Sequence, residues 1–557
     1  MLIGYGCENF RAFEYANLDI KPITILLGAN GVGKTSLLQI PLLFQQTANS
    51  SSREYRSPLK IHGHSVGFGD ALNIIYKHNE SEACSLSIKF TDEELVSLVR
   101  GRLLSEYQSY IIELGEFAQY QMIRQSDDSK SYSSPRYINI LGDLRRQRNH
   151  KSPPTLENIE AVLSILKEVE GDLDLSEWLS FRPSPFSFFG RYGKKRSGKG
   201  VISPDNIRAT YDFLMRLRSI NPTCFTVEFG FSVKPGEGEI RKLESREIKL
   251  YFDNTLFISL RAPRSAKTIS VTSDLLTKEE TASLAIDLAG ALDLQAPVFH
   301  ILRPDDGPSE SHMRDIVLSV LRRALSSLEQ SFRSDMINHV GPLRAYPKRY
   351  YFLDIAATGS PQGDSLVELL RENVKLRDEV NSWLARFGIK IDVEQYREVI
   401  HRLAVNRENL GFDLDITDVG FGLSQVLPVI TQSFLAKPGS ITVIEQPEIH
   451  LHPNMQADLA DLFISVVNKG QAGEPKPNLI IETHSEYLLN RLRRRIAERA
   501  ISSDDVALYF VERDRAVGEV KSHVRRVEIS SAGAFEWPLE FFENTLEDTL
   551  QFLELQE

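Results

Sequence analysis

The pattern of hydrophobic and polar positions divides this chain into segments with different expected structures. Short apolar runs separated by turns fill residues 1–90 and predict strands, with one helix after residue 34. From residue 91 onward the apolar residues recur at helical spacing. This spacing predicts helices over residues 93–114, 156–169, 206–217, 278–292 and 313–336.

Strand-like runs also occur inside and after this helical region. The runs at 225–229, 248–252 and 256–260 predict a small antiparallel sheet, because turn-forming residues separate them. Two apolar runs at 441–445 and 478–482 are typical of buried strands. A chain of 557 residues exceeds the usual size of a single core, so we expect a principal domain that carries a large insertion.

We therefore predict an α/β protein whose principal domain is built from two halves of the chain. The expected boundaries are 1–90 for the first half, 91–335 for a mainly helical insertion, 336–500 for the second half and 501–557 for a C-terminal strand and helix extension. The helices of the insertion lack a sustained heptad pattern, so long coiled-coil arms are not expected.

Composition and charge limit the classes of function. The chain is 42% hydrophobic and 25% charged, as in ordinary globular proteins. Its formal charge of -11 and pI near 5.7 exclude a surface that binds nucleic acid throughout, so any contact with DNA would be regional. The isolated Cys7, Cys84 and Cys224 form no zinc or redox motif, and we find no signal peptide or membrane span. We expect a cytoplasmic protein.

A phosphate-binding loop is the clearest chemical motif. The segment Gly28–Thr35 fits G-x-x-x-x-G-K-[ST], follows the apolar run Ile23–Leu27 and precedes an amphipathic helix, a context that a chance glycine turn would lack. Lys34 is expected to reach the β- and γ-phosphates of ATP, and the Thr35 hydroxyl to ligate Mg²⁺. The residues predicted to bind the nucleotide here are Asn30, Gly31, Gly33, Lys34, Thr35 and Ser36.

Two later strands end in residues suited to the same site. The run 441–445 ends in Glu445, the candidate partner of Thr35 in holding Mg²⁺. The run 478–482 leads into Thr483-His484-Ser485, where His484 is placed to contact the γ-phosphate or the attacking water; the alternative is a helix-capping role. Upstream, the glycine-rich turn 418–425 opens an apolar helix.

The order of these motifs resembles that of ABC-type ATPases of the SMC and RecF kind, in a compact bacterial branch related to OLD-family nucleases. The resemblance covers both ends of the chain and hardly touches residues 91–335. The motifs that carry it are Glu8–Phe13, Gly28–Thr35, Gly341–Arg344, Pro447–Pro453 and Thr483–Ser485. The resemblance implies an ATPase head with a mixed central sheet flanked by helices, and two heads that enclose ATP between them.

The sequence departs from that family pattern at three places. Gln446 occupies the usual position of the catalytic base, so either Glu448 is the base or hydrolysis is slow. The signature turn is degenerate, and Gly422 and Ser424 are its candidate contacts with the partner's ATP. The segment Val511–Arg513 resembles the start of a TOPRIM nuclease domain but lacks the Asp-x-Asp strand end, so no TOPRIM domain is expected.

The resemblance extends to stand-alone ATPases of Septu-type and retron-associated anti-phage defence systems. It implies a switch that is a homodimer or higher oligomer and acts on nucleic acid or on a partner effector, with a separate HNH-type nuclease. One alternative is a DNA-repair ATPase like RecF that binds DNA directly. Another is a nucleotide-gated scaffold that hardly hydrolyses ATP. A transporter ATPase is the least favoured.

Three further segments have both a functional and a structural interpretation. Glu448, His450 and His452 resemble a metal cluster, but a structural loop fits them better. The arginines between 491 and 499 predict a solvated helix face, with DNA contact as the alternative. The basic segment Arg191–Lys199, within an aromatic-rich stretch, is either a solvated loop or a nucleic-acid contact.

Overall fold

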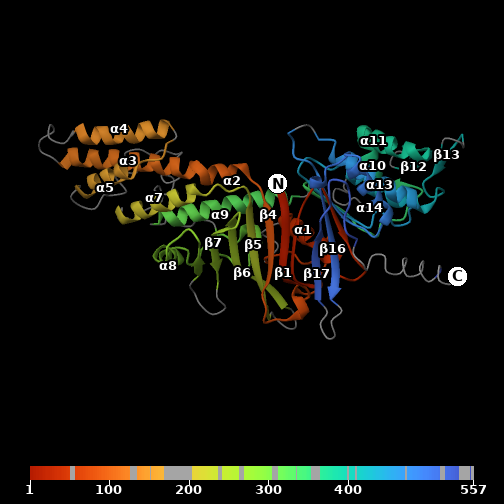
Figure 1. Cartoon of the computed structure of the whole chain (residues 1–557), viewed down its shortest axis with the longest axis horizontal. Helices are drawn as coiled ribbons and strands as arrows, with labels where there is room; N and C mark the ends of the chain where they lie inside the picture. The colour runs from red at the N-terminus through yellow and green to blue at the C-terminus, as the bar shows by residue number, and fades with distance from the viewer. Residues whose placement is uncertain are drawn as a thin grey trace.

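A computed structural model defines the fold (Figure 1). It describes residues 1–50, 57–125, 135–150, 152–168, 204–235, 241–262, 269–303, 311–333, 335–352, 364–397, 400–407, 411–470, 473–514, 521–537 and 552. The basic segment Arg191–Lys199 lies outside these residues. The molecule is elongated, with the helical insertion at one end and the helices α10–α14 at the other.

A thirteen-stranded mixed sheet runs through the molecule in the order β8-β7-β6-β5-β4-β1-β2-β17-β16-β3-β15-β14-β9. Strands β16, β3, β15, β14 and β9 pair in parallel, whereas β8 to β2 pair in antiparallel fashion. The strands are β1 (Leu2–Phe10), β2 (Phe13–Asp19), β3 (Ile23–Leu27), β4 (Cys84–Phe90), β5 (Phe225–Pro235), β6 (Arg241–Phe252), β7 (Thr255–Arg261), β8 (Ser270–Thr272), β9 (Ile337–Val340), β14 (Ile441–Glu445), β15 (Asn478–Glu482), β16 (Val506–Asp514) and β17 (Lys521–Val527).

Helices flank this sheet, and a small second sheet lies beside the C-terminal half. The second sheet contains β10 (Tyr351–Phe352), β11 (Ile389–Arg397), β12 (Ile400–Arg407) and β13 (Asp413–Asp415). The helices are α1 (Lys34–Ala48), α2 (Glu93–Ser97), α3 (Leu103–Gln125), α4 (Pro135–Asn149), α5 (Leu156–Glu168), α7 (Pro204–Ser219), α8 (Lys278–Asp287), α9 (His312–Ser331), α10 (Asp364–Glu372), α11 (Val374–Leu384), α12 (Phe421–Phe434), α13 (Pro453–Val467) and α14 (Glu486–Ala497).

The two faces of the parallel strands supply two separate hydrophobic cores. Successive side chains of a strand point to opposite faces, so Ile25 joins the core under α12–α14, and Leu26 joins the core that contains α1 and α9. Both faces of β3 are covered, which explains why all five of its residues are buried and why four of them are apolar, Thr24 being the exception. The predicted α/β fold with a mixed sheet flanked by helices is confirmed.

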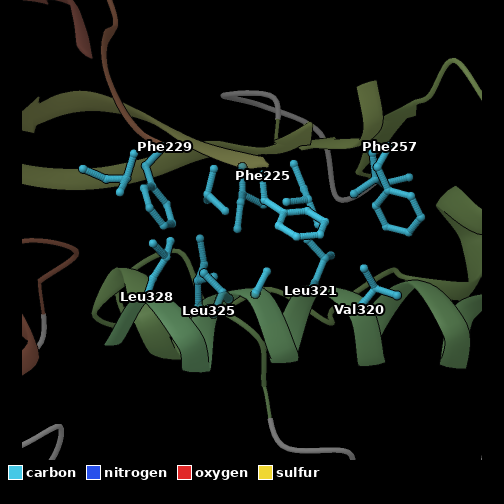
Figure 2. Packing of buried hydrophobic residues seen from close by; sticks show 14 of the residues in the cluster. Phe225, Phe229, Phe257, Val320, Leu321, Leu325 and Leu328 are labelled. Atoms are coloured by element: carbon cyan, nitrogen blue, oxygen red, sulfur yellow. The ribbon is translucent and has the colours of Figure 1, made fainter. Parts of the chain in front are cut away.

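Helix α9 is anchored on strands β5 and β7 of the sheet by aromatic packing. Figure 2 shows Phe225 and Phe229 of β5 and Phe257 of β7 facing the apolar stripe of α9. That stripe includes Leu321 and Leu328, and each of these five residues is at most 1% exposed. Each such side chain contributes about 1.5–3 kcal/mol relative to its exposed state, so α9 is firmly fixed to the strands.

Two segments lie elsewhere than the sequence pattern indicates. The predicted strands within 225–260 are antiparallel as expected, but they do not form a separate small sheet, because β5 pairs with β4 and continues the main sheet. The segment expected as a C-terminal extension supplies β16 and β17, which lie in the middle of that sheet. Val511–Arg513 therefore belongs to a strand beside β3.

Candidate nucleotide-binding site

The residues of the candidate site, some predicted and some not, gather where four neighbouring parallel strands end. Gly28 follows β3, Glu482 ends β15, Glu445 ends β14, and His339 lies on β9. Glu445 and Glu482 are directly opposite each other in the register of β14 and β15. The carboxyl edge of a parallel sheet is the usual position of ligand sites in α/β proteins, because the connecting loops diverge there.

The phosphate-binding loop adopts a conformation that requires glycine. Gly28, Gly31 and Gly33 have backbone φ angles of 143°, 77° and 107°, which residues other than glycine rarely adopt. A Cβ atom on Gly28 would lie 2.3 Å from the carbonyl oxygen of Val511, so β16 packs directly against the loop. Asn30 and Gly31 are exposed at the tip of the loop, whereas Ser36 is buried at the start of α1.

Lys34 is held by the loop itself and by a carboxylate. Its Nζ atom donates to the carbonyl oxygens of Gly28 at 3.0 Å and Ala29 at 2.8 Å, and it lies 3.6 Å from Oε1 of Glu482. Burial lowers the pKa of Lys34, and the attraction of Glu482 opposes this shift. The ammonium group is thus desolvated. Its present partners are two carbonyl oxygens and one carboxylate, which phosphate oxygens can replace as acceptors.

Glu482 is a site residue that the sequence prediction missed. Besides facing Lys34, its Oε2 atom accepts a hydrogen bond from the exposed Thr35 hydroxyl at 3.3 Å. Burial raises the pKa of Glu482, while Lys34 lowers it. Glu445, the predicted partner of Thr35, instead lies 2.7 Å from Nε2 of His339. The available signal was the position of Glu482 at the end of a buried strand, just before Thr483-His484.

Glu448 connects the loop after β14 to the segment after β15. Its Oε2 atom accepts a hydrogen bond from the Thr483 hydroxyl at 2.8 Å, and its Oε1 atom accepts one from the His484 backbone N–H at 2.6 Å. Burial raises the pKa of Glu448, and these hydrogen bonds oppose the shift. The predicted base therefore has both carboxylate oxygens engaged within the chain.

His484 has a neutral ring at physiological pH. Burial, with a smaller effect of Lys34, lowers its pKa to about 4. Its Nε2 atom is buried and has no hydrogen-bond partner among the described residues, which is costly unless a ligand supplies one. The alternative capping role is wrong, because Ser485 is the residue whose hydroxyl caps α14.

Arg344 ties the signature turn to the end of β14. Its Nη1 atom donates to the carbonyl oxygen of Gln425 at 3.2 Å, and its Nη2 atom donates to the carbonyl oxygens of Glu445 at 2.8 Å and Gln446 at 3.1 Å. Burial lowers the pKa of Arg344 to about 10, so it remains a cation at neutral pH. Arg344 was noted in the sequence as part of a motif but not as a site residue.

The signature turn packs closely against the loop after β14. A Cβ atom on Gly422 would lie 2.8 Å from the carbonyl oxygen of His450, so glycine allows this contact. Ser424 is 8% exposed and Gln425 is 3% exposed. The structure therefore places Ser424 inside the chain, and its predicted contact with a partner's nucleotide stays a prediction.

The other sequence motifs have structural roles. His452 caps α13 by accepting a hydrogen bond from the Asn454 backbone at its Nδ1 atom, 3.3 Å away, as a structural loop requires. The expectation of a solvated arginine face on α14 is wrong in part. Arg491 and Arg495 both bind Asp461 of α13, because the two helices pack together.

The residues of this site fit Mg²⁺ and a nucleotide. Successive loop glycines turn the backbone into a cradle for phosphates, with the buried ammonium of Lys34 at its base. The Thr35 hydroxyl and the carboxylates of Glu445 and Glu482 are oxygen ligands of the kind that Mg²⁺ prefers. The orphaned Nε2 atom of His484 provides a further polar group for a ligand.

One of three comparisons with known proteins agrees with this geometry. A family model described as "AAA ATPase domain" matches residues 7–171 and 363–489, which together cover more than half of the chain. The SMC head domain from Thermotoga maritima aligns with 7% identity over 95% of this chain and 99% of that chain, with a TM-score of 0.32, and we infer nothing from a likeness that low. No curated protein sequence matches significantly.

Helices long and apolar enough to cross a membrane are absent from the described part of the chain. The family match includes the loop Gly28–Thr35 and the strands that end in Glu445 and Glu482. The chain therefore belongs to the AAA ATPase domain family.

Proposed function

We propose that this chain binds ATP with Mg²⁺ at the carboxyl ends of β3, β14 and β15 and hydrolyses it slowly. The observation that carries the proposal is the convergence of Lys34 and Thr35 on Glu482, in register with Glu445. A buried lysine and a hydroxyl at the start of a helix, facing two strand-end carboxylates, form the arrangement that holds a phosphate chain and its cation.

Each residue then has a defined task. Lys34 leaves Glu482 to meet the phosphates, and Thr35 with Glu445 and Glu482 holds Mg²⁺. When bound, the cation neutralises phosphate charge and so lowers the barrier to attack by water. His484, with a neutral ring, offers its Nε2 atom to the terminal phosphate or the attacking water.

Glu448 is the candidate base, but its contacts favour a positioning role. Each oxygen of Glu448 accepts one hydrogen bond from the Thr483–His484 segment, so the carboxylate is held in place and in turn fixes the backbone of His484. With Gln446 at the usual base position, this arrangement supports slow hydrolysis.

The decisive experiment compares the wild type with Lys34→Ala. We expect the wild type to bind ATP and to release ADP only with Mg²⁺, and Lys34→Ala to lose at least tenfold in ATP affinity. Thermal unfolding of both proteins checks that the variant folds. Equal ATP affinity in the two folded proteins would contradict the proposal.

The biological role that we propose rests on the motif resemblance. It is a dimeric cytoplasmic switch in an anti-phage defence system that works beside a separate HNH-type nuclease. An HNH or reverse-transcriptase gene beside this one, and co-purification of its product, would support that role. Salt-sensitive binding of duplex DNA by the purified chain alone would favour the RecF-like alternative instead. Tight ATP binding with no measurable ADP release would favour the scaffold.

A further inference from the structure

A second cavity lies in the helical insertion, away from the P-loop. Its volume is about 910 Å³, within the range of small-molecule sites. It is bounded by α2, the start of α3, the end of α4 and the end of α7.

Four arginines from three separate elements line this cavity. Arg100 and Arg102 come from the turn between α2 and α3, Arg148 from the last turn of α4, and Arg218 from the last turn of α7. Arg102 pairs with Glu106 at 3.1 Å. The other three have no acidic partner within the described ranges of the chain.

The positive charge of the cavity is thus largely uncompensated. Glu93 is the single acidic side chain among the described lining residues. Arg100, Arg102 and Arg148 are exposed, so solvent screens their mutual repulsion, but their shared positive charge still attracts an anion. Arginine also has the planar pair of donors that matches phosphate oxygens.

The backbone at this cavity is irregular. Residues Leu98–Arg102 form a π-helical turn, closed by a hydrogen bond from the Leu103 N–H to the Leu98 carbonyl. Such turns interrupt α-helices frequently at functional sites. Gly101 lies within the turn, and a Cβ atom there would meet no atom within 4 Å, so its backbone faces open space. The nearby Gln108, 2% exposed, joins α3 to α4 through the Leu144 carbonyl.

The lining also indicates what kind of anion fits. No aromatic side chain is among the described lining residues, so the cavity lacks a platform for stacking a series of bases. All four arginines line one cavity, whereas proteins that bind a nucleic-acid strand usually carry positive charge along a groove that follows the backbone. We propose that this cavity binds a small molecule that carries two or more phosphate groups, independently of the nucleotide site at Gly28–Thr35.

The test uses the full chain with Lys34→Ala, so that the P-loop site contributes little. Inorganic tripolyphosphate is titrated by calorimetry, with ATP and a 20-nucleotide single-stranded DNA in parallel. We expect one tripolyphosphate per chain, and an affinity at least tenfold weaker when Arg148→Ala and Arg218→Ala are added. Arg208→Ala is the matched control: it lies on α7, is ion-paired with Glu160 and should change affinity less than twofold.

Thermal unfolding establishes that each variant is folded. Arg218→Lys, which keeps the charge but loses the planar donor pair, should give an intermediate affinity. No binding of tripolyphosphate to the Lys34→Ala protein would overturn the proposal. An equal loss in Arg208→Ala would also overturn it, as would tighter binding of the DNA than of tripolyphosphate with the same dependence on the arginines.

Discussion

Lys34 has a carboxylate partner within the proposed nucleotide site. Glu482 lies 3.6 Å from its Nζ atom, so the phosphates must displace this carboxylate to bind. We predict that Glu482→Gln binds ATP about tenfold more tightly without Mg²⁺, a gain of about 1.4 kcal/mol, because a competing negative charge is removed. Fluorescent ATP titrated in EDTA measures this effect.

The same variant should respond less to Mg²⁺, because it loses one of the proposed oxygen ligands. Glu445→Gln is the matched control, since Glu445 lies beside Glu482 in register but is paired with His339. We expect Glu445→Gln to lose the Mg²⁺ effect without the gain in EDTA. An unchanged EDTA affinity in Glu482→Gln would mean that Glu482 does not compete for Lys34.

The two possible roles of Glu448, general base and positioning residue, can be distinguished by removing one of its hydrogen-bond donors. Thr483→Val removes the hydroxyl that binds Oε2 of Glu448 and keeps the side-chain shape. If Glu448 positions the His484 segment, kcat should fall about tenfold with little change in KM. If Glu448 is the base, a freed carboxylate oxygen should leave kcat unchanged or raise it. Glu448→Gln should reduce kcat under either role, so Thr483→Val is the informative variant.

Site residues that belong to local motifs are predictable from the sequence, whereas site residues that strand order brings together are not. Lys34 and Thr35 follow from the loop pattern alone. Glu482 reaches them only because β15 lies between β3 and β14, a non-local pairing that no local pattern encodes. Arg344 has its role through three backbone carbonyl groups from two distant segments. Such contacts leave no periodic trace in the sequence.

At the scale of elements, α14 packs against α13 and is joined to it by ion pairs that share one aspartate. Asp461, 10% exposed as a side chain, accepts from both Arg491 and Arg495. We predict that Asp461→Ala lowers the free energy of unfolding by about 2 kcal/mol, because two arginines lose a partly buried partner. Arg494→Ala removes an exposed pair with Glu498 and should cost less than about 0.5 kcal/mol. Urea unfolding measures both, and equal effects would contradict this stabilising role of Asp461.

A buried histidine in the first turn of α9, His312, makes the free energy of unfolding depend on pH. His312 packs edge-on against Tyr110 of α3, 4.7 Å between ring centroids, and burial lowers its pKa from 6.5 to about 4. Between pH 6.5 and 4 the unfolded chain binds a proton that the folded chain does not, so this residue destabilises the fold as pH falls.

We therefore predict that His312→Phe loses less stability than the wild type between pH 7.5 and 5, measured by denaturant unfolding. The exposed His62 provides a control, because His62→Phe should leave the pH dependence of stability unchanged. The same pH dependence in wild type and His312→Phe would show that His312 does not titrate in this range.

The positions of the helices and strands along the chain were largely predictable, whereas the pairing of each strand with its neighbours in the sheet was not. Apolar periodicity located α5, α7 and α9, because each buries one face. It could not assign β5–β8 to the main sheet, since alternation specifies which face is buried but not which edge a strand joins. For the same reason β16 was expected in an extension, although it lies beside β3.

At the scale of the whole molecule, the proposed switch requires ATP to change the association of chains. The tip of the P-loop, Asn30 and Gly31, is exposed and is therefore accessible to a second chain. A site completed by two chains should show an ATP-dependent mass. We predict that the wild type is monomeric without nucleotide and dimeric with Mg²⁺–ATP, as measured by light scattering during gel filtration.

Glu448→Gln should retain the dimer longer than the wild type, because slower hydrolysis prolongs the ATP-bound state. Lys34→Ala should remain monomeric, because it does not hold the phosphates. Addition of ADP distinguishes a switch from a permanent dimer: the mass should return to that of a monomer as ATP is consumed. A dimer that persists in Lys34→Ala without nucleotide would mean that chain association does not depend on the site at β3, β14 and β15, and the switch would then need another trigger.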